Sequence, residues 1–261
     1  MDTGTRFWNQ RGLIDGEKLA RTRFIVVGAG AIGSFFVVAL SKMGARRITV
    51  YDFDKLEDHN FANQMHPISQ LGKAKVDSLK VVASDYGDCE IEAVEGPWTE
   101  DSELPRLDDK TGAVLSGVGA VPDDDTVVVS CVDNMDVRRT LWEHYRDKGV
   151  FFIDGRMSAL VFKVYGVDTA SPAAKDYYER TLHSQAEAAP ERCGEKSIIY
   201  TVLAVSSQML FQVHKWLNGA YRPTEVICDL FNNTLRQTYH MEQVLEVCEE
   251  EPEETTTETK S

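Results

Sequence analysis

Three glycines have the spacing of a phosphate-binding turn. Gly28, Gly30 and Gly33 fit the pattern G-x-G-x-x-G, and they stand between a run of β-branched and aromatic residues, 23–28, and an apolar helical segment, 34–43. Glycines permit a tight turn and let a phosphate approach the backbone, while the start of the helix offers free N–H groups and a positive dipole end. This context predicts a bound nucleotide. The glycines do not say which nucleotide it is.

An acidic residue follows the second predicted strand. Asp52 comes directly after the strand 47–51, about twenty residues beyond the glycines, where a carboxylate can accept hydrogen bonds from ribose hydroxyls. This arrangement serves NAD as well as it serves ATP. An NAD-dependent oxidoreductase and an ATP-binding enzyme therefore both remain open on these residues alone.

Strand and helix patterns alternate along the rest of the chain. Hydrophobic patterns predict further strands at 90–94, 126–132, 150–154, 159–167 and 225–231, and helices at 72–84, 137–148 and 197–216. Weak periodicity predicts irregular segments at 52–70, 96–125 and 171–195, the last of them a crossover. The alternation predicts an α/β, Rossmann-like fold, in which a mostly parallel twisted sheet carries helices on both faces. Ligands of such sheets bind at the carboxyl ends of the strands, where the strand order reverses.

Three further motifs follow the glycine turn. Residues 52–64 read D-F-D-K-L-E-D-H-N-F-A-N-Q, residues 71–75 read L-G-K-A-K, and residues 131–138 read C-V-D-N-M-D-V-R. In this order they resemble the D-x-D-x-V-E-x-x-N-L-x-R-Q, V-G-x-x-K and C-x-D-N-x-x-x-R motifs of the ThiF/MoeB/HesA family, the ubiquitin-activating-enzyme-like adenylyltransferases. The order and approximate spacing of the motifs agree with those of the family from Arg6 to the long helix that starts near Ser197. The resemblance implies a ThiF-type adenylation domain over 1–245.

The resemblance implies that the protein adenylates a carboxyl group. In that family ATP binds with Mg²⁺, and a substrate carboxylate displaces pyrophosphate. Carried onto this chain, it implies that Lys75 sets a cation beside the phosphates and that Asp133 is both catalytic and the Mg²⁺ ligand. It further implies nucleotide binding by a larger set: Gly28, Gly30, Gly33, Asp52, Asp54, Asn60, Asn63, Lys75, Asp133 and Asn134. The implied substrate is the C-terminus of a small ubiquitin-like or sulfur-carrier protein or peptide, and the implied assembly is a homodimer.

Several of these residues have a structural alternative. Lys75 alone would suit a solvated helix surface, and Asp133 would suit a helix N-cap. Asp54 and Asn60 would suit a turn. The oxidoreductase alternative, however, gives no reason for Lys75, Asn60 and Asp133 to follow one another in this order.

Two positions depart from the family pattern. Asn63 stands where an arginine is expected before Gln64, and Asn9 stands in place of the second arginine of an N-terminal motif. Both family arginines help to hold ATP phosphates, so a catalytically weakened, nucleotide-binding relative is a third alternative. Arg11 and Arg156 are the hypothetical substitutes for the lost charges.

A cysteine precedes the last predicted helix. Cys193 lies in P-E-R-C-G-E-K, close to two cations and to a helix N-terminus, which together favour a thiolate. Its position is similar to that of the family's crossover cysteine, which implies that Cys193 receives the activated acyl group as a thioester. An incidental cysteine is the alternative.

The overall charge is acidic. The 261 residues include 28 Lys and Arg against 42 Asp and Glu, a net charge of −14, so we expect no nucleic-acid partner. Residues 246–261 concentrate glutamates without apolar anchors, which predicts an acidic disordered tail. No apolar run approaches the roughly 20 residues of a membrane span, so we expect no membrane partner. The five widely spaced cysteines suit a reducing cytoplasm better than a disulfide framework.

Overall fold

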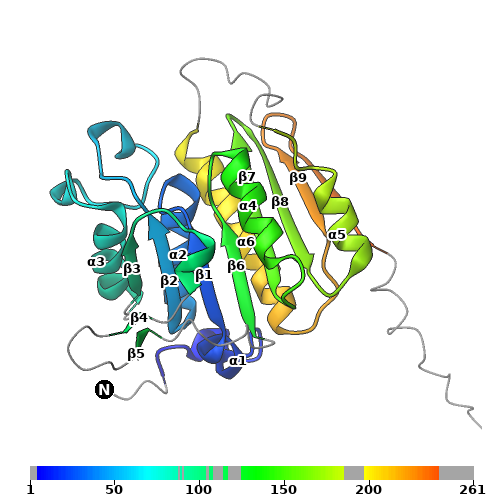
Figure 1. Cartoon of the computed structure of the whole chain (residues 1–261), viewed down its shortest axis with the longest axis horizontal. Coiled ribbons are helices and arrows are strands. Elements are labelled where there is room, and N and C mark those ends of the chain that lie inside the picture. The colour runs from blue at the N-terminus through cyan, green and yellow to red at the C-terminus, as the bar shows by residue number, and fades with distance from the viewer. Residues whose placement is uncertain are drawn as a thin grey trace, which may run out of the picture.

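An eight-stranded sheet forms the centre of the protein (Figure 1). The computed structural model describes residues 5–87, 89, 91–103, 106–107, 114–116, 125–184 and 197–240. The strands of the sheet are β1 (Arg23–Val27), β2 (Arg47–Asp52), β3 (Glu92–Glu95), β6 (Thr126–Ser130), β7 (Phe151–Ser158), β8 (Val161–Asp168), β9 (Glu225–Asp229) and β10 (Thr234–Thr238). A separate two-stranded sheet pairs β4 (Arg106–Leu107) with β5 (Val114–Ser116).

The large sheet has a parallel part and an antiparallel part. Its strand order is β10-β9-β8-β7-β6-β1-β2-β3. The pairs from β7 to β3 are parallel, whereas β8, β9 and β10 are added antiparallel at one edge. The chain moves outward from β1 through β2 to β3 and then returns to place β6 on the other side of β1. The strand order therefore reverses between β1 and β6, the point where open α/β sheets bind ligands.

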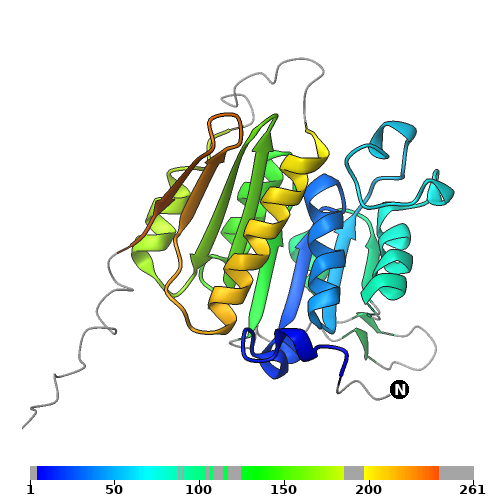
Figure 2. The ribbon, with the colours of Figure 1, turned by 180° about the vertical axis from the view of Figure 1, so that it is seen from behind.

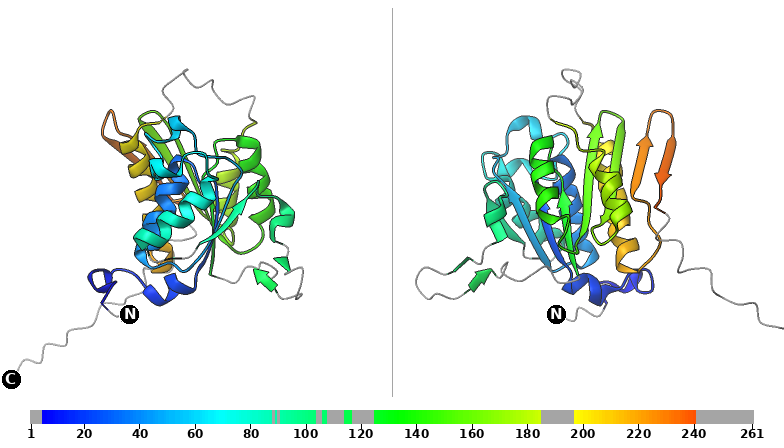
Figure 3. Two further views of the ribbon diagram at one scale, coloured as in Figure 1. Left: turned by 90° about the vertical axis from the view of Figure 1, so that its left-hand side faces the viewer. Right: turned by 45° about the vertical axis from the view of Figure 1, so that its right-hand side comes forward.

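Helices cover both faces of the sheet. They are α1 (Gly16–Arg21), α2 (Ala31–Met43), α3 (Lys75–Gly87), α4 (Met135–Tyr145), α5 (Pro172–Glu179) and α6 (Ile199–Leu217). Short 3₁₀ helices span Trp8–Gln10, Asp58–Asn60, Ile68–Gln70 and Glu100–Glu103. Helices α2 and α6 lie side by side on one face (Figure 2), and α4 and α5 lie on the other (Figure 1). The turned views of Figure 3 show the sheet between these two layers.

Alternation along the strands divides the core in two. In β1, Phe24 and Val26 pack with α2, α3 and α6, whereas Ile25 and Val27 pack with α4 and α5. Successive side chains of a strand point to opposite faces, so a strand covered on both sides reads as a continuous apolar run. The predicted Rossmann-like sheet with helices on both faces is confirmed.

Helix α5 was not predicted, and the irregular segment expected over 171–195 is wrong for residues 172–179. Ser171 caps the helix by accepting a hydrogen bond from the Ala174 amide at 3.3 Å. Pro172 occupies the first turn, where its missing N–H leaves no bond unmade. Only Ala174 and Tyr178 are buried, so the helix has too few apolar residues to show a period in the sequence.

The last strand, β10, was also not predicted. The sequence pattern extends the preceding strand to 231, but β9 ends at Asp229, whose carboxylate accepts hydrogen bonds from the amides of Phe231 and Asn232. The chain then turns back through Asn233, which has a φ of +50°. Four of the five residues of β10 are exposed, so it lacks the apolar residues that mark a strand. Among the described residues, no helix has the length and hydropathy needed to cross a membrane.

Candidate active site at the carboxyl ends of β1, β2 and β6

In the turn after β1, close packing requires a glycine at two positions. Gly28 has a φ of +103°, and a Cβ there would lie 2.6 Å from the carbonyl oxygen of Cys131. At Gly33 a Cβ would lie 1.9 Å from the carbonyl oxygen of Gly28. Both glycines therefore allow the turn, the start of α2 and the end of β6 to come together.

Gly30 differs from these two glycines. It is the N-cap of α2, has a φ of −77°, and a Cβ there would meet nothing within 4 Å. No contact among the described residues therefore requires a glycine at this position. The open space lies at a helix N-terminus, where backbone N–H groups and the helix dipole attract anions.

Three hydrogen bonds connect the glycine turn to Lys75. The Ala29 amide donates to Oδ2 of Asp52 at 2.7 Å, and the Asp54 amide donates to Oδ1 of Asp52 at 2.8 Å. The Asp54 carboxylate then accepts from Nζ of Lys75 at 2.7 Å. The sequence-predicted residues Asp52, Asp54 and Lys75 thus belong to one network at the ends of β1 and β2.

Lys75 is a buried cation. Its side chain is 9% exposed, whereas that of its partner Asp54 is 49% exposed. Its backbone amide also donates to the Asp54 carbonyl at 2.9 Å, which fixes the first residue of α3 against the end of β2. The alternative of a solvated surface lysine therefore does not hold.

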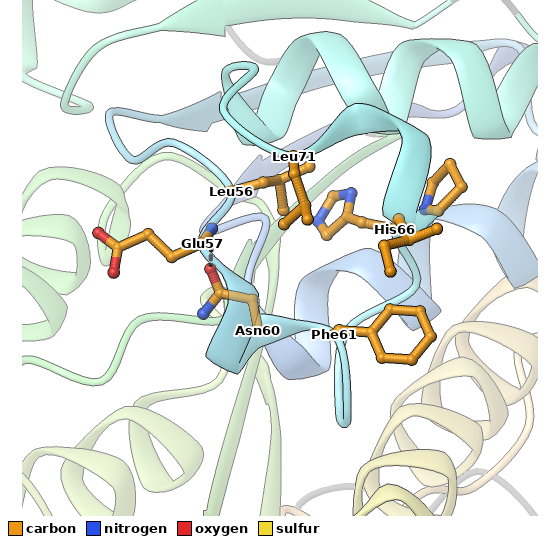
Figure 4. Close-up of a pocket in the computed structure, with 8 residues that line it drawn as sticks. Leu56, Glu57, Asn60, Phe61, His66 and Leu71 are labelled. Carbon is orange, nitrogen blue, oxygen red and sulfur yellow. Dashed lines mark hydrogen bonds between the residues drawn. The ribbon is translucent and has the colours of Figure 1, made fainter.

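Residues 53–74 form an excursion between β2 and α3. Its two ends meet where Lys55 bridges to Ala74. Inside it, Oδ1 of Asn60 accepts from the Glu57 amide at 2.9 Å and closes a capping box on a 3₁₀ helix (Figure 4). Asn60 thus shapes the turn, as its structural alternative proposed, and it is one of the residues that line a small pocket.

Asn63 joins the excursion to the last helix. Its side-chain amide donates to Oγ of Ser197, just before α6. The residue that replaces a family arginine therefore has a structural contact in the described part of the chain. This bond holds the excursion next to the segment that leads out of the crossover.

His66 is a buried residue that the sequence did not single out. Nε2 lies 3.0 Å from the Ala29 carbonyl oxygen and Nδ1 lies 3.0 Å from Oγ of Ser78. Burial, with a smaller effect from the charge of Lys75, lowers the pKa of His66. A neutral imidazole thus ties the glycine turn to α3. A lone histidine in an irregular segment carries no signal of such a contact.

The segment after β6 presents Asp133 to solvent. Asp133 is exposed and makes no hydrogen bond or ion pair with the described residues. Its neighbour Asn134 caps α4, because its side-chain oxygen accepts from the amides of Asp136 at 2.8 Å and Val137 at 3.1 Å. Burial raises the pKa of the Cys131 thiol, and the residue packs against Gly28 and Gly33 of the glycine turn.

A known protein family matches nearly the whole chain. The family model of the ThiF family matches residues 5–255. The chain belongs to the ThiF family. The match includes all the site residues described above.

Several curated relatives share part of this ThiF sequence. The chain is 30% identical over 136 residues, 51% of its length, to tRNA threonylcarbamoyladenosine dehydratase 2 of Saccharomyces cerevisiae, of which this covers 28%. It is 34% identical over 88 residues, 33% of its length, to tRNA threonylcarbamoyladenosine dehydratase of Bacillus subtilis, of which this covers 35%. Molybdopterin-synthase adenylyltransferase of Haemophilus influenzae is 26% identical over 61% of both chains. The chain thus spans less than two thirds of each of these relatives.

Solved structures share the ThiF fold. PaaA superimposes with a TM-score of 0.63 and 16% identity, over 90% of this chain and 68% of that one. Escherichia coli MccB, solved with AMPCPP and MccA, superimposes with a TM-score of 0.65 and 13% identity, over 91% and 72%. At these identities the likeness concerns the fold.

The carboxylates at this site of the ThiF protein fit a magnesium ion that is bound together with phosphates. Mg²⁺ is usually held by one or two carboxylates, waters and substrate phosphate oxygens, so a cluster of protein ligands is not needed. The Asp133 carboxylate has no partner in the part of the chain that the structure describes, and Asp54 is half exposed. Among the described residues no group of three or more His, Cys, Asp or Glu side chains could hold a metal. An ion here would depend on the nucleotide.

Arg11 and Arg156, the hypothetical replacements for the two missing family arginines, have other partners in this ThiF protein. Arg156 donates from Nε to Asp154 at 2.6 Å and from Nη1 to the Thr181 carbonyl at 3.0 Å. To reach a phosphate it would have to break these bonds. Arg11 stacks over Trp8, with its guanidinium carbon 4.7 Å from the ring centroid. Cys193 and the acidic segment 246–261 lie outside the described residues.

Proposed function

We propose that the protein binds ATP at the carboxyl ends of β1, β2 and β6 and adenylates a substrate carboxylate. The observation that carries this proposal is the run of three hydrogen bonds from Ala29 through Asp52 and Asp54 to Lys75. It connects a buried cation, through Asp54 and Asp52, to the glycine turn in which Gly30 has open space next to it. A positive charge supplied by such a site stabilises the charge that develops during phosphoryl chemistry.

Adenylation depends more on the positioning of ATP and the substrate carboxylate than on proton transfer. One oxygen of the substrate carboxylate attacks the α-phosphorus of ATP, forming a P–O bond. The bond from that phosphorus to the bridging oxygen breaks, and pyrophosphate leaves with the electron pair. Because the carboxylate is already ionised, no general base is required. Lys75 would move from Asp54 towards the phosphates as their negative charge increases.

Asp133 is the proposed protein ligand of magnesium. Bound there with the nucleotide, the ion would neutralise the charge of the leaving pyrophosphate. The exposed carboxylate of Asp133 and its place directly after β6 support this role. The partly exposed carboxylate of Asp54 would become available for ligand contacts when Lys75 turns to the phosphates.

The proposed substrate is the C-terminal carboxylate of a small ubiquitin-like or sulfur-carrier protein, or of a peptide. Relatives named ubiquitin-like modifier-activating enzyme 5 and molybdopterin-synthase adenylyltransferase support this class. A modified tRNA is the second candidate, because two relatives are named tRNA threonylcarbamoyladenosine dehydratases. The net charge of −14 disfavours tRNA, since affinity for many phosphates depends on positive charges that release their counterions.

Transfer to Cys193 is a separate proposal. The thiolate would attack the acyl carbon of the adenylate, a thioester would form, and AMP would leave. The support is the sequence alone, namely the cations on either side of Cys193 and its place before α6. A Cys193→Ala protein that still forms a substrate thioester would rule this residue out.

The proposed assembly is a homodimer that meets along α6. Tyr200, Leu203 and Phe211 are exposed on one side of this helix, with the small Ser207 between them. An antiparallel second copy would place the apolar ends of one helix against those of the other, with Ser207 at the crossing, as a two-fold interface requires. Sedimentation of the Leu203→Glu protein should show a monomer under conditions in which the wild type is a dimer.

The substrate class can be tested by direct product analysis. The protein is incubated with Mg·ATP and either a panel of carrier proteins or a tRNA preparation, and AMP and pyrophosphate are measured. Pyrophosphate release that needs a carrier, and that is lost when its C-terminal carboxylate is amidated, would support the proposed substrate. Release that needs tRNA would support the second candidate. Nucleotide binding without release in either case would contradict an active adenylation site.

A further inference from the structure

A buried cluster of charges lies beside the proposed site. Asp154, in β7, has no exposed area. Its Oδ1 accepts from Nε of Arg138 at 2.8 Å, and its Oδ2 accepts from Nε of Arg156 at 2.6 Å and from the Tyr178 hydroxyl at 2.9 Å. One carboxylate thus joins α4, β7 and α5.

Each arginine also holds a second segment of backbone. Nη2 of Arg138 donates to the carbonyl oxygen of Val132, the residue before Asp133. Nη1 and Nη2 of Arg156 donate to the carbonyl oxygen of Thr181 at 3.0 Å and to its hydroxyl at 3.1 Å. One side of the cluster therefore fixes the loop 131–134, and the other side fixes the segment 181–184, which leads towards the crossover.

Asp154 is charged in this environment. Burial raises its pKa, but the charges of Arg138 and Arg156 and their hydrogen bonds outweigh burial and hold that pKa below its usual value. Buried ion pairs contribute little net stability, because desolvation cancels most of their attraction. The geometry of this cluster is thus better explained by what it positions than by the stability it adds.

We propose that Asp154 is a positioning residue that couples the loop 131–134 to the segment 181–184. When a nucleotide orders the loop, the hydrogen bonds through Arg138, Asp154 and Arg156 also restrict the motion of Thr181. The start of the crossover is then more rigid while the site is occupied. This coupling rests on the proposed nucleotide binding at Asp133. The connection between the two segments is independent of it.

Hydrogen exchange of the full chain tests the coupling. Amide exchange is followed in peptides covering 131–137 and 179–184, with and without Mg²⁺ and the ATP analogue AMPCPP. In the wild type we expect protection of both peptides. In Asp154→Asn and Arg156→Gln the nucleotide should still protect 131–137, but its protection of 179–184 should fall by about fivefold or more, the usual lower range of coupling between sites. Arg156→Gln leaves the Arg138–Asp154 pair in place, so it remains informative if Asp154→Asn folds poorly.

A matched control separates coupling from a general loss of stability. Asp168→Asn breaks another Arg–Asp pair, in which Nη2 of Arg222 lies 2.9 Å from Oδ2 of Asp168, the last residue of β8, which pairs with Phe151 rather than with Asp154. This variant should keep nucleotide protection of both peptides. Unchanged protection of 179–184 in both cluster variants would overturn the proposal.

The nucleotide-free arm distinguishes the coupling from the proposed function. If AMPCPP protects no peptide in the wild type, nucleotide binding at this site is contradicted. Without nucleotide, Asp154→Asn should still speed exchange in both 131–137 and 179–184 relative to Asp168→Asn. Faster exchange in only one of them would overturn the connection itself.

Discussion

Oδ2 of Asp52 accepts a hydrogen bond from the Ala29 amide at 2.7 Å, so the side chain that ends β2 holds the glycine turn that follows β1. Its other oxygen accepts from the Asp54 amide at 2.8 Å. Both oxygens have protein partners before a ribose arrives. A carboxylate has about four acceptor sites, so a ribose contact would be added to these bonds rather than replace them.

Removal of this carboxylate should affect both stability and binding. In Asp52→Ala the amides of Ala29 and Asp54 lose their acceptor, and we expect a loss of about 1–3 kcal/mol in the free energy of unfolding. ATP affinity should fall with it, because the turn is no longer held. Urea denaturation and calorimetric ATP binding measure the two effects. A variant as stable as wild type would show that Asp52 does not hold the turn.

Substitutions at Gly33 and Gly30 should separate effects on folding from effects on nucleotide binding. In Gly33→Ala the new Cβ would lie 1.9 Å from the Gly28 carbonyl oxygen, so we expect destabilisation by about 1–3 kcal/mol or more. In Gly30→Ala the Cβ meets no protein atom, so the fold should lose less than about 1 kcal/mol. Because that Cβ fills the proposed phosphate space, ATP affinity should fall about tenfold or more, or at least 1.4 kcal/mol. Full ATP affinity in Gly30→Ala would place the phosphates elsewhere.

Substitutions at Asp133 and at its neighbour Asn134 should separate Mg²⁺ dependence from stability. Asp133→Asn breaks no bond to the described residues, so the thermal midpoint should stay unchanged while the dependence of activity on Mg²⁺ weakens. Asn134→Ala removes the cap of α4 and should cost about 1 kcal/mol of stability. Asp136→Asn, an exposed change in the same turn, is the control for lost charge. If Asp133→Asn kept the Mg²⁺ dependence of the wild type, another ligand would hold the ion.

His66 should make part of the stability depend on pH. Its pKa is lowered in the folded protein, mainly by burial, so the folded chain keeps it neutral where the unfolded chain binds a proton. Its contribution is complete above the unfolded pKa of about 6.5 and decreases as the pH falls below that value. In urea titrations between about pH 8 and pH 5, His66→Gln should lose this part of the slope. A slope equal to that of the wild type would mean that folding does not lower the pKa of His66.

The sequence predicted the parts of the site that belong to local patterns. The glycine turn and Asp52 follow predicted strands, so the pattern of the neighbouring residues locates them. Lys75 is singled out by the resemblance to the family's V-G-x-x-K motif. The pairing of Asp154 with Arg138 could not be predicted, because it depends on the register that sets Ser130 beside Asp154 in neighbouring strands.

Contacts across the tertiary structure explain the other omissions. His66 gains its role only when α3 packs beside the glycine turn, which no local pattern reports. The exposed strand β10 and the short helix α5 carry too few apolar residues to be recognised. The contact of Asn63 with Ser197 likewise appears only in the fold, whereas the turn-forming role of Asn60 was a structural alternative that the sequence already offered. Contact of either residue with a nucleotide stays a prediction.

ATP–pyrophosphate exchange with Mg²⁺, in the presence of candidate carrier proteins, tests adenylation most directly. Exchange should depend on a carrier, and Lys75→Ala should reduce it about 10²–10³-fold, the usual cost of removing one preorganised charge-stabilising group. Lys80→Ala removes an exposed lysine from the same helix and should leave exchange within about twofold of the wild type. Carrier-dependent exchange that is unchanged in Lys75→Ala would contradict the role given to the Lys75–Asp54 pair. Clear ATP binding with no exchange for any carrier would contradict adenylation of this substrate class.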